Sequence, residues 1–155
     1  MVSEIKIQCG KFLALKETIT VSLLGNPSET NATVNSSVSK LKACGVFVSG
    51  PPIIWAGARI DGDKVILERK LILQCAGDMS RISTGFERKK ATKIGPCIHA
   101  RFIGDEQNLV RAFEKVSVYA YENEIELKKE NYTVYVKNDG PVYTIDIFVP
   151  LEGGG

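Results

Sequence analysis

The sequence predicts an α+β fold built from two similar halves. The same order of elements (strand, helix, strand, tight turn, strand) is expected twice along the 155 residues. Two turn sequences, Asp61-Gly62-Asp63 and Asn138-Asp139-Gly140, each separate a pair of apolar runs and therefore predict β-hairpins. Apolar residues at helical spacing precede each hairpin. Because the period is too long for a solenoid, the pattern predicts one domain with two-fold pseudosymmetry.

The first half begins with a strand, because Ile5, Ile7 and Cys9 alternate with polar residues. The elements expected after it are an extended stretch at 12–21, a turn and helix start at Asn26-Pro27-Ser28, a helix marked by Val34, Val38 and Leu41 that stops at Gly45, and hairpin strands at 53–60 and 65–73. This half therefore supplies one helix and one hairpin.

The second half repeats this order after a connector. The elements expected are an extended stretch at 82–91, a break at Gly95-Pro96, a strand at 97–103, a helix capped by Asp105 with an apolar face of Leu109, Val110, Phe113, Val116 and Ala120, and hairpin strands at 132–136 and 142–149. The two halves thus predict a single domain over 1–151. Repeat one covers about 1–75, the connector about 76–95 and repeat two about 96–151, and a disordered tail follows at 152–155.

Composition excludes several classes of function. The formal net charge of +2 is too small for a nucleic-acid footprint, so direct nucleic-acid binding is not expected. No signal peptide or membrane-spanning run is recognised, which favours a cytoplasmic protein without a membrane partner. The four cysteines match no zinc signature and are expected to be reduced. His99 is the only histidine and is expected to be structural, so no metal is predicted.

Two acidic residues interrupt apolar strands at matching places in the two halves, Glu68 in the first and Asp146 in the second. Strand alternation places Asp146 on one face with Thr144 and Phe148. A carboxylate buried without a partner costs several kcal/mol, so each acid needs a reason for its position. Two interpretations are open. Each acid faces solvent or pairs with Lys or Arg, or at least one lines a cleft and binds a cationic or polar ligand.

Aromatic residues also recur in both halves. Trp55 is the only tryptophan, and simple alignment of the hairpins places Tyr135 at the equivalent position. Either residue is a core side chain or a stacking surface for a planar or cationic ligand. Phe102 and Phe148 are open to the same two interpretations, as core residues or as a pocket wall.

The chain resembles the GyrI-like, effector-binding domain family, which includes the drug-sensing domains of multidrug-responsive transcription activators. The resemblance covers nearly the whole chain. It is carried by the segments 98–104, Ala112-Phe113, 135–139 and 144–151, in which Asp146 stands four residues before Pro150, and by Gly50-Pro51-Pro52, Trp55 and Glu68 in the first half. It implies two pseudosymmetric βαββ repeats that form antiparallel sheet with two helices packed on one side and a ligand cleft. It also implies a ligand site made of Trp55, Glu68, Tyr135, Asp146, Phe102 and Phe148.

The resemblance favours a stand-alone domain that binds a small amphipathic or cationic compound, without a cofactor. No helix-turn-helix segment is recognised before the domain, so DNA binding is not implied. An alternative is a hydrolase of strained electrophiles, with Glu68 or Asp146 as general base beside Tyr135. Another is a protein-binding inhibitor of DNA gyrase, and a separate transcription regulator is a further candidate partner. Haem binding through His99 is the weakest alternative.

Overall fold

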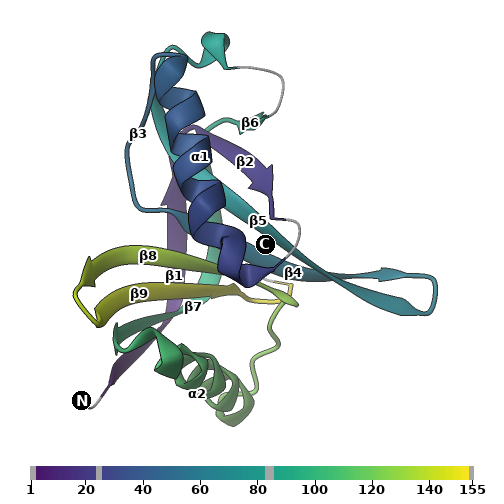
Figure 1. Cartoon of the computed structure of the whole chain (residues 1–155). Helices are drawn as coiled ribbons and strands as arrows, with labels where there is room; N and C mark the ends of the chain where they lie inside the picture. The colour runs from purple at the N-terminus through teal and green to yellow at the C-terminus, as the bar shows by residue number, and fades with distance from the viewer. Residues whose placement is uncertain (1–2, 24–25, 83–85, 154–155) are drawn as a thin grey trace. The chain divides into compact units, whose positions relative to one another are not determined.

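The computed structural model describes residues 3–23, 26–82 and 86–153. The chain divides into two units. The first unit is Leu15–Thr92, and the second unit combines Met1–Ala14 with Lys93–Gly155. Each unit consists of antiparallel strands and one α-helix (Figure 1), so the predicted α+β class is confirmed. The predicted extent of the single domain and of its tail stays a prediction, and residues 154–155 of that tail lie outside the described residues.

The first unit contains one long hairpin to which the remaining strands are added. Its elements are β2 (Thr18–Ser22), α1 (Thr30–Ala43), β3 (Val46–Val48), β4 (Ile53–Asp61), β5 (Lys64–Gly77) and β6 (Glu87–Lys89), with 3₁₀ turns at Pro27–Glu29 and Met79–Arg81. Within this unit the strand order is β4-β5-β2-β6, and β3 pairs with β5. Only the short β6 forms within the stretch 82–91 that we expected to be extended, and residues 83–85 lie outside the described part.

The second unit carries the site described below. Its elements are β1 (Glu4–Leu15), β7 (Thr92–Gly104), α2 (Leu109–Glu122), β8 (Glu130–Asp139) and β9 (Val142–Pro150), with a 3₁₀ turn at Glu106–Asn108. The strand order in this unit is β1-β7-β9-β8. The N-terminal strand therefore lies beside β7 and belongs to the second unit, whereas the sequence pattern counted it with the first repeat.

Helix α2 covers one face of the second unit's sheet because its buried residues recur every four positions. Ala112, Val116 and Ala120 are almost completely buried, and they pack with alternate residues of β7 and β9 in one apolar cluster. The prediction that Val110 belongs to this face is wrong, because its side chain is 57% exposed. Two positions on a helix turn by about 200°, which directs Val110 away from the face that Ala112 occupies.

The residues predicted to begin both helices and to end α1 are found at these positions. The side chain of Asp105 accepts a hydrogen bond from the backbone N–H of Gln107, as a capping residue does, in the 3₁₀ turn that leads into α2. Asn26 does the same for the turn before α1. Gly45, with φ of 79°, follows the end of α1, so the predicted stop is confirmed.

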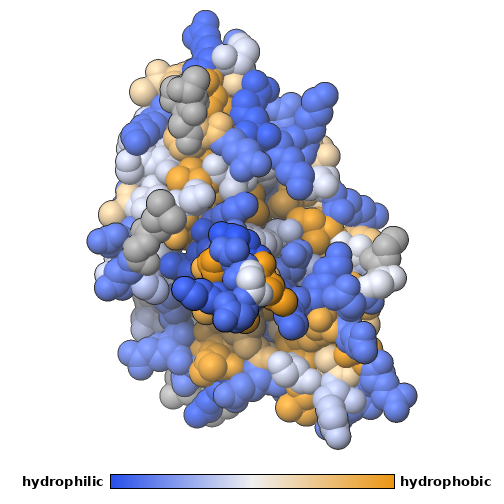
Figure 2. All heavy atoms as spheres, turned by 90° about the vertical axis from the view of Figure 1, so that its right-hand side faces the viewer, coloured by the Kyte–Doolittle hydropathy of each residue, from blue (hydrophilic) through white to orange (hydrophobic). Residues whose placement is uncertain are grey.

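The hairpin of β4 and β5 extends beyond the core of its unit. The face that buries Ile54 and Leu71 continues along both strands to Ile60, Val65 and Leu67, which are 75%, 68% and 80% exposed. Figure 2 faces the end of this hairpin, where apolar atoms lie at the surface among hydrophilic ones. The same sheet face therefore changes from core to exposed apolar surface along a single hairpin.

Candidate functional site

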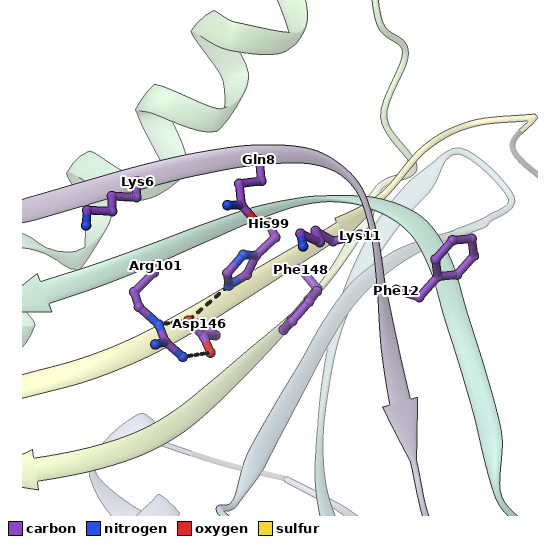
Figure 3. Close-up of a pocket in the computed structure, with 8 residues that line it drawn as sticks. All are labelled: Lys6, Gln8, Lys11, Phe12, His99, Arg101, Asp146 and Phe148. Atoms are coloured by element: carbon purple, nitrogen blue, oxygen red, sulfur yellow. Dashed lines mark hydrogen bonds and ion pairs between the residues drawn. The ribbon is translucent and has the colours of Figure 1, made fainter.

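A pocket of about 450 Å³ lies on the sheet of the second unit, on the face opposite α2. Its volume is within the range of small-molecule sites. Three neighbouring strands supply its wall, and Figure 3 shows Arg101 and His99 directed at the carboxylate of Asp146. The lining residues are Lys6, Gln8, Lys11 and Phe12 of β1, His99 and Arg101 of β7, and Asp146 and Phe148 of β9. The pocket thus combines aromatic and charged groups.

Strand alternation and register explain why these residues meet. Arg101 is directly opposite Asp146 in the ladder between β7 and β9, and His99 is directly opposite Phe148. Residues opposite each other share a face of the sheet, and residues two apart on one strand do so as well. The intervening residues Ile145 and Ile147 face the other way, into the apolar cluster beneath α2. The predicted faces of β9 are therefore confirmed.

Asp146 is buried, and both oxygens of its carboxylate have hydrogen-bond partners. Both of its carboxylate oxygens accept hydrogen bonds from the guanidinium of Arg101, from Nε to Oδ1 and from Nη2 to Oδ2, each at 2.8 Å. Only 12% of the Asp146 side chain is exposed. Burial by itself raises the pKa of this carboxyl group, but the contacts with Arg101 and His99 outweigh burial and lower the pKa to about 2. Asp146 therefore carries its negative charge at neutral pH inside a bidentate ion pair.

His99 is the second partner of Asp146. Its Nε2 lies 3.0 Å from Oδ1 of Asp146, yet this buried nitrogen has no hydrogen bond of good geometry. The imidazole ring stacks on the ring of Phe148, with centroids 4.7 Å apart and planes inclined by 26°. The sequence predicts a structural role for His99, outside the ligand site. Ile98 and Ala100 are fully buried in the apolar cluster, so His99 lies on the other face of β7, the face of Arg101. The alternation of His99 with these two apolar residues is the feature of the sequence that could have shown this.

Two of the residues predicted for the ligand site lie on the opposite face of this sheet. Phe102 is completely buried in the cluster beneath α2, and Tyr135 packs against the same cluster. The aromatic residue of β8 that shares the face of Asp146 is Tyr132, which is directly opposite Phe148. Burial, together with the nearby Glu130 and Cys97, raises the pKa of Tyr132 to about 12, so its hydroxyl stays protonated at neutral pH.

The register of the two hairpins also changes the alignment of the halves. Trp55 is opposite Lys70, six residues after the first residue of β5, and Tyr132 is opposite Phe148, six residues after the first residue of β9. Tyr132 is therefore the counterpart of Trp55, and the alignment of Trp55 with Tyr135 is wrong. The register shift between Tyr135 and Lys137 accounts for one residue of this three-residue difference, and the remaining two come from the alignment of the strands. Glu68 and Asp146 each stand four residues into their strand, so that match is correct.

In the first unit, the predicted site residues also have partners in their own hairpin. Glu68 forms an ion pair with Arg59, and Nζ of Lys70 lies 5.2 Å from the centroid of the Trp55 ring. Both acids singled out in the sequence are therefore paired with arginine in their own unit. This arrangement agrees with the first of the two interpretations of these acids.

The ring of Trp55 lies across Gly57, and this contact gives a first testable prediction. A Cβ atom at residue 57 would be 2.4 Å from Cζ2 of the indole, which is too close for two carbon atoms that are not bonded to each other. We expect Gly57→Ala to displace the ring and shift the emission maximum of this single tryptophan. Ala58→Ser, on the opposite face of β4, is the matched control and is expected to leave the fluorescence spectrum unchanged. Identical spectra for Gly57→Ala and the wild-type protein would contradict this placement of the ring.

A second hollow, of about 530 Å³, lies in the first unit between α1 and β2. Its wall includes Thr33, Ser36, Ser37 and Lys40 of α1. None of the residues predicted for the ligand site lines it. Among the described residues, no group of three His, Cys, Asp or Glu side chains is arranged to hold a metal ion. No helix in the described part of the chain is long and apolar enough to cross a membrane.

The fold is found in several solved structures, although the sequence identities are low. The chain is similar to the EcmrR C-terminal domain, with 12% identity and a TM-score of 0.67 over 98% of this chain and 99% of that one. It is similar to EcmrR in a cryo-EM EcmrR–DNA complex, with 12% identity and a TM-score of 0.66 over 97% of this chain and 57% of that one. It is also similar to SAV2435 bound to tetraphenylphosphonium, with 13% identity and a TM-score of 0.54 over 97% and 94%.

These similarities show that the chain has the fold of GyrI-like effector-binding domains, as the resemblance in sequence implies. The chain spans 57% of the length of EcmrR in the DNA complex. No protein-family model matches the chain, and no curated protein matches it by sequence.

Proposed function

We propose that this chain is an effector-binding domain whose pocket in the second unit binds a small amphipathic molecule. The observation that carries the proposal is a pocket of about 450 Å³ in which the stacked rings of His99 and Phe148 lie next to charged side chains. An apolar ring surface with a few polar groups at fixed positions is typical of small-molecule sites. The shared fold supports the proposal, because SAV2435 was determined with tetraphenylphosphonium bound.

A regulatory role is part of this proposal. EcmrR, whose C-terminal domain has this fold, was determined in complex with DNA. We infer that ligand binding by the present chain likewise serves a transcription regulator. The alternatives of a hydrolase and of a gyrase inhibitor gain no support from the geometry. A carboxylate with a pKa of about 2 that is held by a guanidinium is a weak general base, and Glu68 is held by Arg59.

The proposal is tested by thermal shift with a panel of anionic, neutral and cationic aromatic compounds that includes tetraphenylphosphonium. A ligand that binds only the folded state raises the melting temperature by mass action. We expect at least one compound to do so, and Phe148→Ala to weaken its binding about tenfold, because the stacking surface is removed. Phe47→Ala, at an aromatic side chain of β3 that is 60% exposed, is the control and should leave affinity unchanged.

Two results would contradict the proposal. One is the absence of any stabilising compound in the panel. The other is an equal effect of Phe148→Ala and Phe47→Ala on the affinity of every compound that binds, because binding would then not depend on this pocket.

A further inference from the structure

The pocket of the second unit has an excess of positive charge. Its described lining contains three cationic side chains, Lys6, Lys11 and Arg101, against one carboxylate, Asp146. His99 adds a further positive charge whenever it is protonated. A cationic ligand would therefore enter a site in which cations already outnumber anions.

The single carboxylate is not available to a ligand. Arg101 occupies both of its oxygens, and His99 lies against Oδ1. The Arg101 guanidinium and the Asp146 carboxylate thus cancel each other as charges within the wall of the pocket. A ligand cation would have to displace a bidentate arginine to reach the acid, at the cost of leaving that arginine without its partner.

The two lysines are the charges that remain. Lys6 and Lys11 are exposed residues of β1, and neither forms an ion pair among the described residues. Figure 3 shows both on the same strand at the wall of the pocket, with Gln8 between them. Lys93 lies close to this wall as well, because its Nζ is 4.5 Å from the centroid of the Phe12 ring. The uncompensated charge of the site is therefore positive and lies along β1.

The apolar surface comes from two phenylalanine rings, one on β9 and one on β1. Phe148 of β9 presents a ring that is stacked on His99, and Phe12, which is 46% exposed, lies beyond the bend of β1. A molecule that packs against these rings and also pairs with the lysines has an aromatic or other flat apolar body and an anionic group. Ammonium groups bind carboxylate, sulfonate and phosphate as point charges, without demanding one geometry.

We propose that the pocket selects amphipathic organic anions, with Lys6 and Lys11 pairing with the anionic group and the His99–Phe148 stack holding the apolar body. This proposal rests on the proposed function, since it names the ligand class of the same pocket. It reverses the cation preference that the acids of the sequence suggested, because those acids are already paired.

The test uses two ions with the same four phenyl rings and opposite permanent charge, tetraphenylborate and tetraphenylphosphonium. Isothermal titration calorimetry on the full chain in a sodium buffer measures the affinity of both. We expect the borate to bind roughly tenfold more tightly, which corresponds to a modest electrostatic preference at a partly exposed site. Raising the salt concentration should reduce that ratio, because exposed charges are screened.

The two ions differ in more than the sign of their charge, so the ratio of their affinities is compared between variants of the protein, where these other differences cancel. The double variant Lys6→Gln with Lys11→Gln is expected to reduce the ratio of affinities to about one, mainly by weakening the borate. The matched control is Lys115→Gln with Lys128→Gln, which removes the same net charge at exposed residues of the same unit that do not line the pocket, and it should keep the wild-type ratio.

The outcomes separate the two proposals. Tighter binding of the phosphonium, or equal ratios in both double variants, would overturn the anion selectivity and leave the proposed function in place. Failure of both ions to bind, together with failure of the wider aromatic panel, would overturn the proposed function and the anion selectivity together.

Discussion

Replacing Phe102 by alanine is expected to lower the free energy of unfolding by about 3–5 kcal/mol, the usual cost of removing a fully buried phenylalanine side chain. Phe102 is completely buried in the apolar cluster between α2 and the sheet of the second unit. Its neighbours there include Ala112 and Val116, which are short and fixed on a helix. They cannot fill the space of a lost ring, so a cavity should remain. Urea unfolding followed by circular dichroism measures the loss.

The same position separates a core role from a ligand-binding role. Because Phe102 faces α2 while the pocket lies on the opposite face, we expect the milder variant Phe102→Leu to remain folded and to keep the affinity of any ligand that Phe148→Ala weakens. Volume-conserving changes of this kind usually cost less than about 1.5 kcal/mol. Loss of ligand affinity in a stably folded Phe102→Leu variant, equal to that in Phe148→Ala, would place Phe102 in the site and contradict the core assignment.

The fold was largely predictable because local chemistry determines most of its elements. The hairpin turns are set by glycine residues, and the helix boundaries by Asp105 and Gly45. Where the signal is weak the prediction failed. The three-residue strand β3 is too short to show alternation, and the partner of the N-terminal strand depends on β7, about ninety residues further along the chain.

Only the part of the candidate site that lies on a single strand was predictable from the sequence. The rest depends on which residues of neighbouring strands are paired. Alternation along a single strand places Asp146 and Phe148 correctly, since both lie on β9. The ion pair between Arg101 and Asp146 joins residues 45 positions apart, and neither strand alone shows which residue the other places opposite. One register irregularity between Tyr135 and Lys137 is enough to move the aromatic ring of β8 that faces the site from Tyr135 to Tyr132.

The negative charge of Asp146 contributes to the stability of the folded protein. Since burial alone would favour the neutral acid, the lowered pKa of about 2 measures how strongly Arg101 and His99 stabilise the carboxylate. A fall from 3.8 to about 2 corresponds to roughly 2 kcal/mol of folding stability. This contribution is fully present above the unfolded value of 3.8 and is lost as the pH falls towards the folded value of about 2.

Asp146→Asn is therefore expected to lose roughly 2 kcal/mol of stability at pH 7, and progressively less relative to the wild-type protein between pH 4 and pH 2. Urea unfolding of both proteins across this range measures the difference. Subtracting one curve from the other removes the titration of the remaining acids. The exposed Asp63→Asn is the control for loss of one negative charge. A stability difference that stays constant with pH would mean that the contacts with Arg101 and His99 do not lower the pKa of Asp146 in the folded protein.

The same variant distinguishes the two views of the ligand. Asp146→Asn frees the guanidinium of Arg101 and raises the net charge of the pocket by one unit, so an organic anion should bind several-fold more tightly to the folded variant. A pocket that used Asp146 to hold a cation would instead lose affinity for tetraphenylphosphonium and gain nothing for tetraphenylborate. Calorimetry with both ions at pH 7 decides between these results, because the bidentate pair makes Asp146 the internal counter-ion of Arg101 and leaves the lysines of β1 for the ligand.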